Sequence, residues 1–291
     1  MTCPSCNTET SSPVGKYLGT NRVFSNLSLA GCTSCNLVYA APMPTNNELD
    51  AYYKNYWHGD VASSISSTRH YYLAQAITRI RYLKKNIDFS DVRKILDVGA
   101  GPGLFMQALK YEKLSAAYYA IEPDTVERNK LSKNKEVSAT YASINDVPIE
   151  DKYDLIILSH VLEHVASPNA FIANLMKRLT LGGLMFVEVP NNDHLYKQHF
   201  EPHVLFFSAQ SLNGLLAKHG KVIDLCSVGM KYSIPKQASG NPHGKVQQVL
   251  RELAKMFLIW INVITIEKII QRNHIDAYGD DRQWLRALLK T

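Results

Sequence analysis

Hydrophobic positions in the middle of the chain follow two alternating periods. Five short runs rich in β-branched and aromatic residues predict strands at 94–98, 118–122, 154–159, 184–189 and 221–228. Between the strands, apolar residues recur at helical spacing over 104–110, 125–133, 168–179 and 209–218. This alternation predicts an α/β fold, in which βαβ units build a mostly parallel sheet with helices on both faces.

The segments on either side of this region predict helices. Leu73, Ile77 and Ile80 recur at helical spacing within residues 46–90, with basic residues between them. The tail begins with a loop that contains proline and glycine, followed by a long apolar helix over 249–270 and a short helix ending at 284–289. The long helix is apolar on most of its circumference. We therefore expect it to be buried within the protein, in a homodimer interface, or against a membrane surface.

The composition is that of an ordinary globular protein with a sizeable core, with 46% hydrophobic residues and a formal net charge of +6. This mild positive charge suits an anionic substrate, such as a nucleotide-sugar or RNA, without choosing between them. The sequence shows no secretory signal pattern and no run of the roughly 18 apolar residues that span a bilayer. We expect a cytoplasmic protein, and the long apolar helix leaves a peripheral place at the inner membrane face as an alternative.

Four of the five cysteines form two C-x-x-C pairs near the start of the sequence. The pair Cys3 and Cys6 is separated by 25 residues from the pair Cys32 and Cys35. Four thiolates at this spacing can surround one Zn²⁺ tetrahedrally and leave no open position, which indicates a structural metal site. Bound metal would stabilise a small segment that has too few apolar residues to fold alone. Redox-active cysteines are the alternative.

A glycine-rich turn follows the first predicted strand, in the run ILDVGAGPG at residues 95–103. Its glycines let the backbone pass close to a ligand and adopt conformations that other residues avoid. A dinucleotide-binding fingerprint would place glycine three positions after Gly101, where this chain has Leu104. The spacing is instead D-x-G-x-G-x-G. A tight turn in some other nucleotide-binding sheet remains the alternative.

Three later elements support a nucleoside-containing ligand. The next strand ends in Glu122, and a carboxylate at that point can accept hydrogen bonds from both hydroxyls of a ribose. A third strand runs into the loop SHVLEHV, and a glycine turn at 181–183 precedes a fourth strand. Residues 160–164 also match H-x-x-E-H, a zinc protease pattern that must lie on a helix. Here the pattern directly follows a buried strand, which argues against protease chemistry.

In this order, the four elements resemble the class I S-adenosylmethionine-dependent methyltransferases over residues 92–228. The resemblance implies a Rossmann-like, mostly parallel seven-stranded sheet with helices on both faces. With the flanking segments, the chain divides into a zinc ribbon (1–45), a helical substrate or lid segment (46–90), the methyltransferase domain (91–230) and a C-terminal helical extension (231–291). The implied cofactors are S-adenosyl-L-methionine and a structural Zn²⁺.

The same resemblance assigns the cofactor contacts. The glycines line the methionine part, Asp97 supports the turn and the amino group, Glu122 holds the ribose, and the methyl group is bordered by His160, which counts among the catalytic candidates. The full set is Asp97, Gly99, Ala100, Gly101, Gly103, Glu122, Pro123, Ser143, Ile144, Ser159 and His160. One departure concerns the loop beside the adenine, where many relatives have an acid. Asp146 comes slightly late for that contact, which leaves it open.

The acceptor side resembles bacterial sugar methyltransferases. Residues 47–57 look like their segment just past the ribbon, which implies substrate contacts from Tyr53 and Tyr56. Residues 198–208 resemble the H-E-H-x-x-x-F-S run of sugar C-methyltransferases, with His203 as the final His and Glu201 as the first.

Pro202 stands where those enzymes have the central Glu, which puts carbon methylation in doubt. The expected reaction is O-methylation of a sugar hydroxyl on a nucleotide-linked or lipid-linked bacterial glycan, with His203 as general base. Glu201, Asn191 and Asn192 would orient the acceptor.

Other functions fit parts of the sequence. The runner-up is an RNA base methyltransferase that grips RNA with the ribbon, but the only basic cluster lies at 79–85 and reads equally well as a solvated helix face. The sequence therefore argues against a nucleic acid partner. Sugar C-methylation is a second alternative, and a cofactor-binding protein without catalysis is a third. His203 could also serve only as a helix cap or packing residue.

Overall fold

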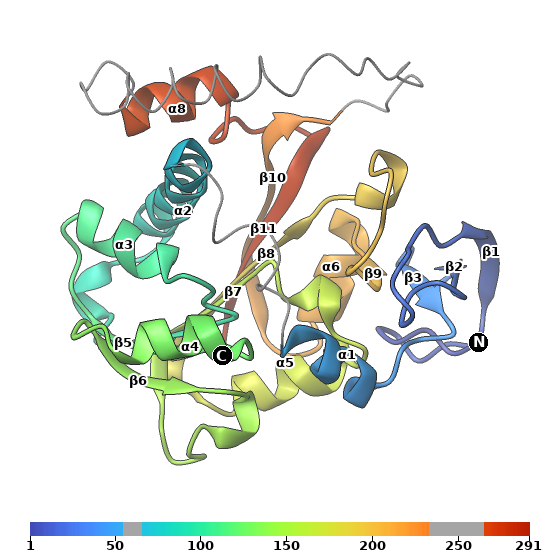
Figure 1. The fold of residues 1–291 in the computed structure, drawn as a ribbon, viewed down its shortest axis with the longest axis horizontal. Coiled ribbons are helices and arrows are strands. Elements are labelled where there is room, and N and C mark those ends of the chain that lie inside the picture. Colours follow the sequence, from blue (N-terminus) through green and yellow to red (C-terminus); the bar gives the residue numbers. More distant parts are fainter. Residues whose placement is uncertain (55–65, 233–264) are drawn as a thin grey trace.

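A seven-stranded sheet runs through the centre of the molecule (Figure 1). The computed structural model describes residues 1–54, 66–232 and 265–291. In spatial order the strands are β10 (Lys221–Lys231), β11 (Arg282–Lys290), β8 (Leu179–Pro190), β7 (Tyr153–Ser159), β4 (Lys94–Val98), β5 (Ala117–Ile121) and β6 (Val137–Tyr141).

The strand directions confirm the predicted α/β class. β4 pairs in parallel with both β5 and β7, and the other neighbours are also parallel except β11, which is antiparallel to β8 and β10. The chain moves outward from β4 to β6 and then returns to β7 on the other side of β4. The order therefore reverses between β4 and β7, and open α/β sheets bind ligands beyond the carboxyl ends of the strands at such a point.

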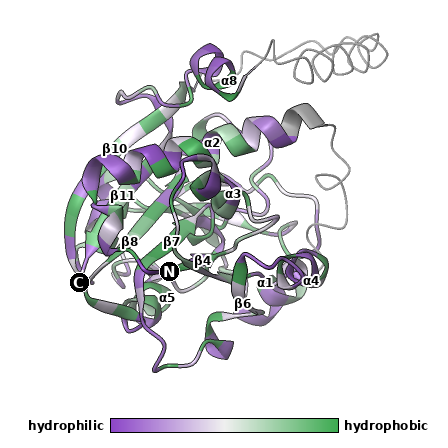
Figure 2. Ribbon diagram, turned by 90° about the vertical axis from the view of Figure 1, so that its left-hand side faces the viewer, coloured by the Kyte–Doolittle hydropathy of each residue, from purple (hydrophilic) through white to green (hydrophobic). Residues whose placement is uncertain are grey.

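Helices cover both faces of this sheet because alternate strand residues point to opposite sides. Ile95 belongs to a core with α2 (Ser66–Asn86), α3 (Leu104–Tyr111) and α8 (Ile266–Asn273), and Leu96 to one with α5 (Pro168–Met176) and α6 (Ala209–Leu216). In Figure 2 the hydrophobic colour is concentrated on the central strands between these helices. α4 (Thr125–Ser132) contacts β6. None of the described helices is long and apolar enough to span a bilayer.

The N-terminal segment forms a second sheet, and one strand of this sheet comes from the main domain. β1 (Ser11–Lys16), β2 (Ser28–Cys32) and β3 (Val38–Ala41) are joined by β9 (Leu205–Phe206), which comes more than 160 residues later. α1 (Asn46–Tyr53) follows, and its first turn is closed by a capping box between Thr45 and Glu48. The ribbon core is continuous with the core around α5 and α6. The N-terminal sheet therefore packs as part of the main body.

In the connections that the structure describes, the short 3₁₀ helices are η2 (Phe89–Asp91), η3 (Ile144–Asp146), η4 (Leu162–His164) and η5 (Asp193–Leu195). η4 carries the last part of the H-x-x-E-H pattern. The described structure has no α-helix there, as expected from the preceding strand.

The predicted short C-terminal helix is wrong. Residues 284–289 lie in β11, between β8 and β10, and all six are buried. A short apolar run buried on both faces has no periodicity that separates a strand from a helix. Of the long helix predicted at 249–270, the structure describes residues 265–270, within and just before α8. The remainder, with the homodimer and membrane contacts predicted from it, lies outside the described residues, as does Tyr56.

Candidate active site

The glycine turn between β4 and α3 adopts backbone conformations that favour glycine. Gly99, Gly101 and Gly103 all have positive φ, at 71°, 51° and 72°. A Cβ on Gly99 would come within 2.5 Å of Cγ2 of Val161, in the loop after β7. The turn is also tied to the end of β5, because Gly99 N donates to Ile121 O at 2.8 Å. The structure thus brings the predicted cofactor turn to the reversal point between β4 and β7.

Glu122 lies beside this turn, at the end of β5. Its two carboxylate oxygens accept from Gly101 N at 2.6 Å and from Asp124 N at 2.8 Å, and only 2% of the residue is exposed. Burial raises the pKa of Glu122 to about 7, although these hydrogen bonds act to lower it. Each oxygen keeps acceptor capacity after these bonds. The predicted contact with ribose hydroxyls is therefore compatible with the bonds that Glu122 makes.

Asp97 is buried below the same turn. Its carboxylate accepts a short hydrogen bond from the Tyr118 hydroxyl. Burial raises the pKa of Asp97 to about 7, and the charge of Glu122 adds to this effect. Two acids with raised pKa values thus lie side by side on the cofactor side of the site. The sequence predicted their positions but contained no signal for their protonation.

The loop expected beside the adenine is held by residues that sequence reasoning did not identify. Asp146 turns back to accept from Ser143 N at 2.8 Å, so it caps its own turn. Arg178 donates to the carbonyls of Ile144, at 3.0 Å, and of Val147, at 3.1 Å. Pro123 contributes a carbonyl that accepts from an arginine side chain. The carboxylate of Asp146 is therefore used within its own turn, which fits its late position in the sequence.

Opposite the glycine turn, a buried glutamate lies among three histidines. Oε1 of Glu163 is 3.2 Å from His160 Nδ1, 3.8 Å from His164 Nε2 and 4.0 Å from His203 Nε2. Its other oxygen has no hydrogen-bond partner within the described structure. Burial acts to raise the pKa of Glu163, but the hydrogen bond from His160 and the nearby histidine charges lower it to about 2.

His203 is held at its other ring nitrogen. Nδ1 lies 2.7 Å from Oδ2 of Asp193, which follows β8 and is fully buried. Lys197 pairs with the same oxygen at 3.0 Å. Burial opposes ionisation of Asp193, but His203 and Lys197 lower its pKa to about 2. Asp193 was missed in the sequence because nothing local marks its pairing with a histidine ten residues later.

His160 connects this group to a buried ion network. Its Nε2 lies 3.1 Å from Oε1 of Glu188, and Glu188 also pairs with Arg79, on α2, and Arg286, on β11. The two arginines hold the pKa of Glu188 well below its usual range despite complete burial. His160 has a φ of 55° and keeps 32% of its side chain exposed. Burial acts to lower the pKa of His160, but hydrogen bonds with Glu163 and Glu188 raise it.

His164 is a neutral neighbour of His203. Burial lowers the pKa of His164 to about 4, and its ring packs edge-on to the His203 ring with centroids 4.8 Å apart. The hydroxyl of Tyr53 lies 2.8 Å from His164 Nδ1. The structure thus places Tyr53 beside His164, and its contact with a substrate stays a prediction.

Three predicted acceptor contacts are found elsewhere. Glu201 does not face the His203 ring: its carboxylate accepts from Thr20 N at 2.7 Å and Asn21 N at 2.9 Å in the N-terminal segment. Asn191 is 3% exposed and donates to Arg282 O and Ser227 Oγ, so it joins β8 to β10 and β11. Asn192 donates to the side chain of Asn191. The orienting role predicted for Glu201 and Asn191 is corrected, because their polar atoms already make structural bonds.

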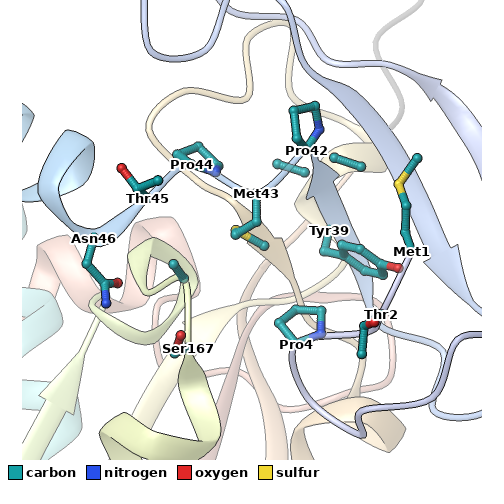
Figure 3. Close-up of a pocket in the computed structure, with 13 residues that line it drawn as sticks. Met1, Thr2, Pro4, Tyr39, Pro42, Met43, Pro44, Thr45, Asn46 and Ser167 are labelled. Atoms are coloured by element: carbon teal, nitrogen blue, oxygen red, sulfur yellow. The ribbon is translucent and has the colours of Figure 1, made fainter.

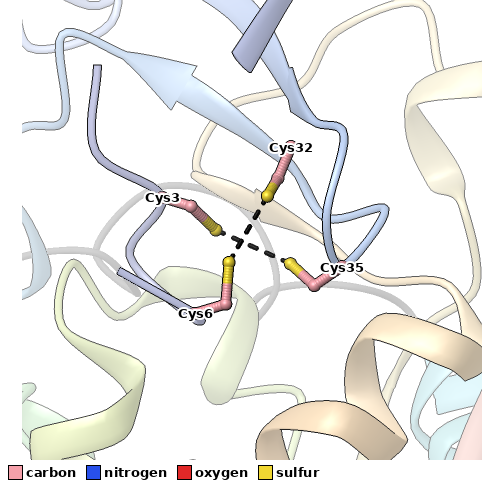
Figure 4. A group of neighbouring side chains, drawn as sticks. All are labelled: Cys3, Cys6, Cys32 and Cys35. Carbon is pink, nitrogen blue, oxygen red and sulfur yellow. Dashed lines mark hydrogen bonds between the residues drawn. The ribbon is translucent and has the colours of Figure 1, made fainter. Parts of the chain in front are cut away.

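The four N-terminal cysteines converge as predicted (Figure 4). Cys3 Sγ is 3.6 Å from Cys35 Sγ, and Cys6 Sγ is 3.4 Å from Cys32 Sγ. Tetrahedral zinc with sulfur ligands at about 2.3 Å separates the sulfurs by about 3.8 Å, so these residues fit that ion. A second group, Glu163 with His164 and His203, also places its ligand atoms within 4.8 Å of one another. Its carboxylate already serves as counter-charge to the histidines.

A cavity of about 540 Å³ lies between the N-terminal segment and the start of α1. Tyr39, Met43 and Pro4 are among its lining side chains, and Ser167 lies on its far side (Figure 3). None of the acids or histidines described above contributes to it. This cavity is therefore separate from the reacting centre.

The reversal in strand order, the glycine turn and the acid at the end of β5 are the features expected of an S-adenosylmethionine-dependent methyltransferase. A family model described as a methyltransferase domain matches residues 65–223, which is more than half of the chain. The chain therefore belongs to this family.

Curated relatives carry the name ubiquinone biosynthesis O-methyltransferase. The mitochondrial protein of Candida albicans is 31% identical over 107 residues, covering 34% of this chain and 33% of the relative. The protein of Bartonella quintana (strain Toulouse) is 27% identical over 203 residues, covering 54% of this chain and 75% of the relative. This chain thus matches a third of the Candida protein and three quarters of the Bartonella protein.

Solved structures of similar fold include further methyltransferases. A SAM-dependent methyltransferase from Archaeoglobus fulgidus is 18% identical, with a TM-score of 0.47, covering 76% of this chain and 94% of that one. The plantazolicin methyltransferase BpumL in complex with SAH is 18% identical, with a TM-score of 0.46, covering 84% of this chain and 96% of that one.

Proposed function

We propose that the protein transfers a methyl group to a hydroxyl oxygen, with His203 as general base. The observation that carries this proposal is the 2.7 Å contact between His203 Nδ1 and Asp193. A carboxylate at Nδ1 keeps that nitrogen protonated and makes Nε2, which has Lys197 Nζ 3.4 Å away, the nitrogen that can accept a proton. Nε2 can take the proton from an acceptor hydroxyl as its oxygen attacks. The resulting imidazolium lies 4.0 Å from Glu163, whose negative charge stabilises it.

The residues of the cofactor side support this reaction by binding the cofactor, and they take no part in the proton transfer. When bound, S-adenosylmethionine supplies a methyl group on a positively charged sulfur, so alignment and removal of the acceptor proton are what the protein must add. Gly99 and Gly101 give the turn its positive φ values, and Glu122 retains acceptor capacity for ribose hydroxyls. His160 lies at the end of β7, between this side and the acids of the acceptor side.

For the acceptor we propose a sugar hydroxyl on a nucleotide-linked or lipid-linked glycan. Support comes from the segment after the ribbon, whose sequence resembles sugar methyltransferases and whose Tyr53 contacts His164. A second candidate is a hydroxyl of a ubiquinone precursor, which the names of the relatives favour. Carbon methylation also stays a candidate, because Asp193 supplies His203 with a carboxylate although Pro202 replaces the expected Glu. We further propose that the four cysteines hold a structural Zn²⁺.

The test is incubation of the full chain with methyl-labelled S-adenosylmethionine and separate pools of nucleotide-sugars, glycolipid extract, ubiquinone-precursor phenols and RNA. Label in a sugar, as an O-methyl group by NMR, would support the proposal. Label in the phenols would select the second candidate, and a C-methyl product or labelled RNA would overturn the assignment of O-methylation. His203→Asn, run in parallel, must lose the label from whichever pool acquires it.

A further inference from the structure

The N-terminal sheet is bonded to the chain directly after His203. β3 pairs with β9, where Tyr39 is opposite Leu205, and Ala40 N donates to Val204 O at 2.8 Å. The Tyr17 hydroxyl donates to the carbonyl of His203 itself at 2.7 Å. The main-chain carbonyls of His203 and of the next residue, Val204, therefore each accept a hydrogen bond from a residue near the start of the sequence.

The chain before His203 is held by the same segment. Phe200 N donates to Leu18 O at 2.7 Å. The carboxylate of Glu201 accepts from Thr20 and Asn21, as described above. Residues 199–204, which we name the His203 loop, are thus bonded to the N-terminal segment on both sides of the histidine.

An aromatic cluster fills the space between the two. Tyr17 is 1% exposed, and its ring centroid lies 5.6 Å from that of Phe200 and 6.0 Å from that of Phe24. Phe206, on β9, completes the cluster at 5.4 Å from Phe200. Buried aromatic pairs of this kind add about 0.5–1.5 kcal/mol each beyond the burial of their area. The N-terminal segment and the His203 loop therefore share a packed hydrophobic core.

The cysteines anchor the strands that make these contacts. Cys32 ends β2, and Cys35 lies in the turn that leads into β3 (Figure 4). The turn with Cys3 and Cys6 is bonded to the main domain, because Lys218 donates to Ser5 O at 2.7 Å. A metal ion at the four sulfurs would join both turns and so fix the edge on which β9 and the His203 loop rest.

We infer that the ribbon is a positioning element of the methyltransferase site, in which Tyr17 fixes the main chain of His203 and the cysteine site holds the strands behind it. This inference rests on the proposed role of His203. The cofactor side is bonded differently: Gly101 and Asp124 donate to Glu122, and Gly99 donates to β5. Loss of the ribbon metal should therefore displace the base while cofactor binding persists.

The first test compares two buried tyrosines of the ribbon. The histidine side-chain region of a ¹⁵N NMR spectrum is recorded for the full chain, and the His203 signal is assigned from its absence in His203→Gln. Tyr17→Phe should shift this signal and lower kcat about tenfold, while the Kd for S-adenosylhomocysteine stays within twofold. Tyr39→Phe is the matched control, because none of the hydrogen bonds of the described residues joins the Tyr39 hydroxyl to the His203 loop. It should leave both readouts unchanged.

The second test removes the metal. Zinc is stripped with a thiol-reactive mercurial and a chelator, quantified, and then returned with reductant. Removal should shift or broaden the His203 signal reversibly, with the Kd for S-adenosylhomocysteine within twofold. An unchanged His203 signal after zinc release would overturn the inference. So would loss of S-adenosylhomocysteine binding, because the ribbon would then support the whole domain rather than the His203 loop.

These readouts separate this inference from the proposed function. The NMR signal and the Kd do not depend on turnover. A displaced His203 ring with normal turnover would reject His203 as base and leave the positioning role standing. An unmoved ring with abolished turnover in Tyr17→Phe would reject the positioning role and leave the base assignment standing.

Discussion

The two acids of the cofactor side, Asp97 and Glu122, are as deeply buried as Glu163 and Asp193 of the acceptor side, all at 4% exposure or less. Their pKa values nevertheless move in opposite directions, to about 7 on the cofactor side and to about 2 on the acceptor side. Burial acts alike on all four. The difference arises because histidines and a lysine face the acceptor-side acids, while backbone N–H groups and a phenol face the others.

This difference shows which half of the site is complete before a ligand binds. On the acceptor side the negative charges are already in place to orient histidines and stabilise an imidazolium, which is the preorganisation that catalysis needs. On the cofactor side the acids stand near the midpoint of titration at neutral pH. They can ionise when the ligand brings hydroxyl donors and a positive sulfur.

The largest effect should come from removing His203, the proposed base of the acceptor side. His203→Ala should lower turnover about 10²–10⁴-fold, the usual contribution of a general base, while the Kd for S-adenosylmethionine stays within twofold. His199→Ala is the matched control in the same loop, because His199 is exposed. Turnover and calorimetric binding measure the two effects. Near-wild-type turnover in His203→Ala would contradict the assignment of His203 as general base. The comparison between the two sides would then say nothing about catalysis.

Next in size is the loss of the carboxylate that orients this base. Asp193→Asn should lower kcat about tenfold to a hundredfold and alter its pH profile, because Nδ1 of His203 no longer faces a negative charge. Lys197→Met removes the ammonium that pairs with the same oxygen and lies 3.2 Å from His203 Nδ1, but it leaves the carboxylate in place, so it should lower kcat less than Asp193→Asn does. Equal losses in both variants would assign the effect to the ion pair instead of the Asp193–His203 contact.

A smaller effect is expected where the two sides touch. Gly99→Ala places a Cβ at positive φ and 2.5 Å from Val161, so it should destabilise the fold by at least about 2 kcal/mol and lower the melting temperature by about 4–8 °C. Gly214→Ala is the control, since no atom lies within 4 Å of its added Cβ in α6, and it should stabilise by about 0.5–1 kcal/mol. Equal melting temperatures for the two variants would contradict the close approach at Gly99.

Parts of this site that lie within one stretch of sequence could be predicted. The strand, turn and helix at β4 and α3, the acid at Glu122 and the two cysteine pairs all depend on local patterns of period and spacing. Tyr53 and His203 were also identified, from the resemblance of their neighbourhoods to those of known methyltransferases. Such patterns can be recognised in a sequence because each follows directly from local backbone geometry or from ligand spacing.

Parts that join distant segments could not be predicted. Arg286 meets Glu188 across 98 residues only because the last segment enters the sheet as β11, and no periodicity identifies that strand. β9 likewise joins β3 from more than 160 residues away. Glu201 was placed beside the acceptor by a motif, whereas the turn at Thr20 binds its carboxylate. The protonation of the four acids depends on burial and neighbours that only the fold supplies.

The smallest effect is on pH dependence, where the two sides should behave oppositely. The raised pKa values of Asp97 and Glu122 mean that their contribution to stability is present below about pH 4 and is lost as pH rises through about 7. Those of Glu163 and Asp193 are lowered, so their contribution is present above about pH 4.5 and is lost only as pH falls through about 2. Of these four acids, only the two on the cofactor side therefore change protonation between pH 6 and 8.

If ribose hydroxyls bind the ionised form of Glu122, the affinity for S-adenosylhomocysteine should rise about tenfold from pH 6 to pH 8, with a proton released at the lower pH. Calorimetry in buffers of different ionisation enthalpy measures both. Glu122→Gln should weaken binding and lose this pH dependence, while Glu136→Gln, at an exposed carboxylate paired with Lys110, should keep it. A flat affinity in the wild type would mean that the cofactor-side acid is already ionised at pH 6, and the contrast between the two sides would not hold.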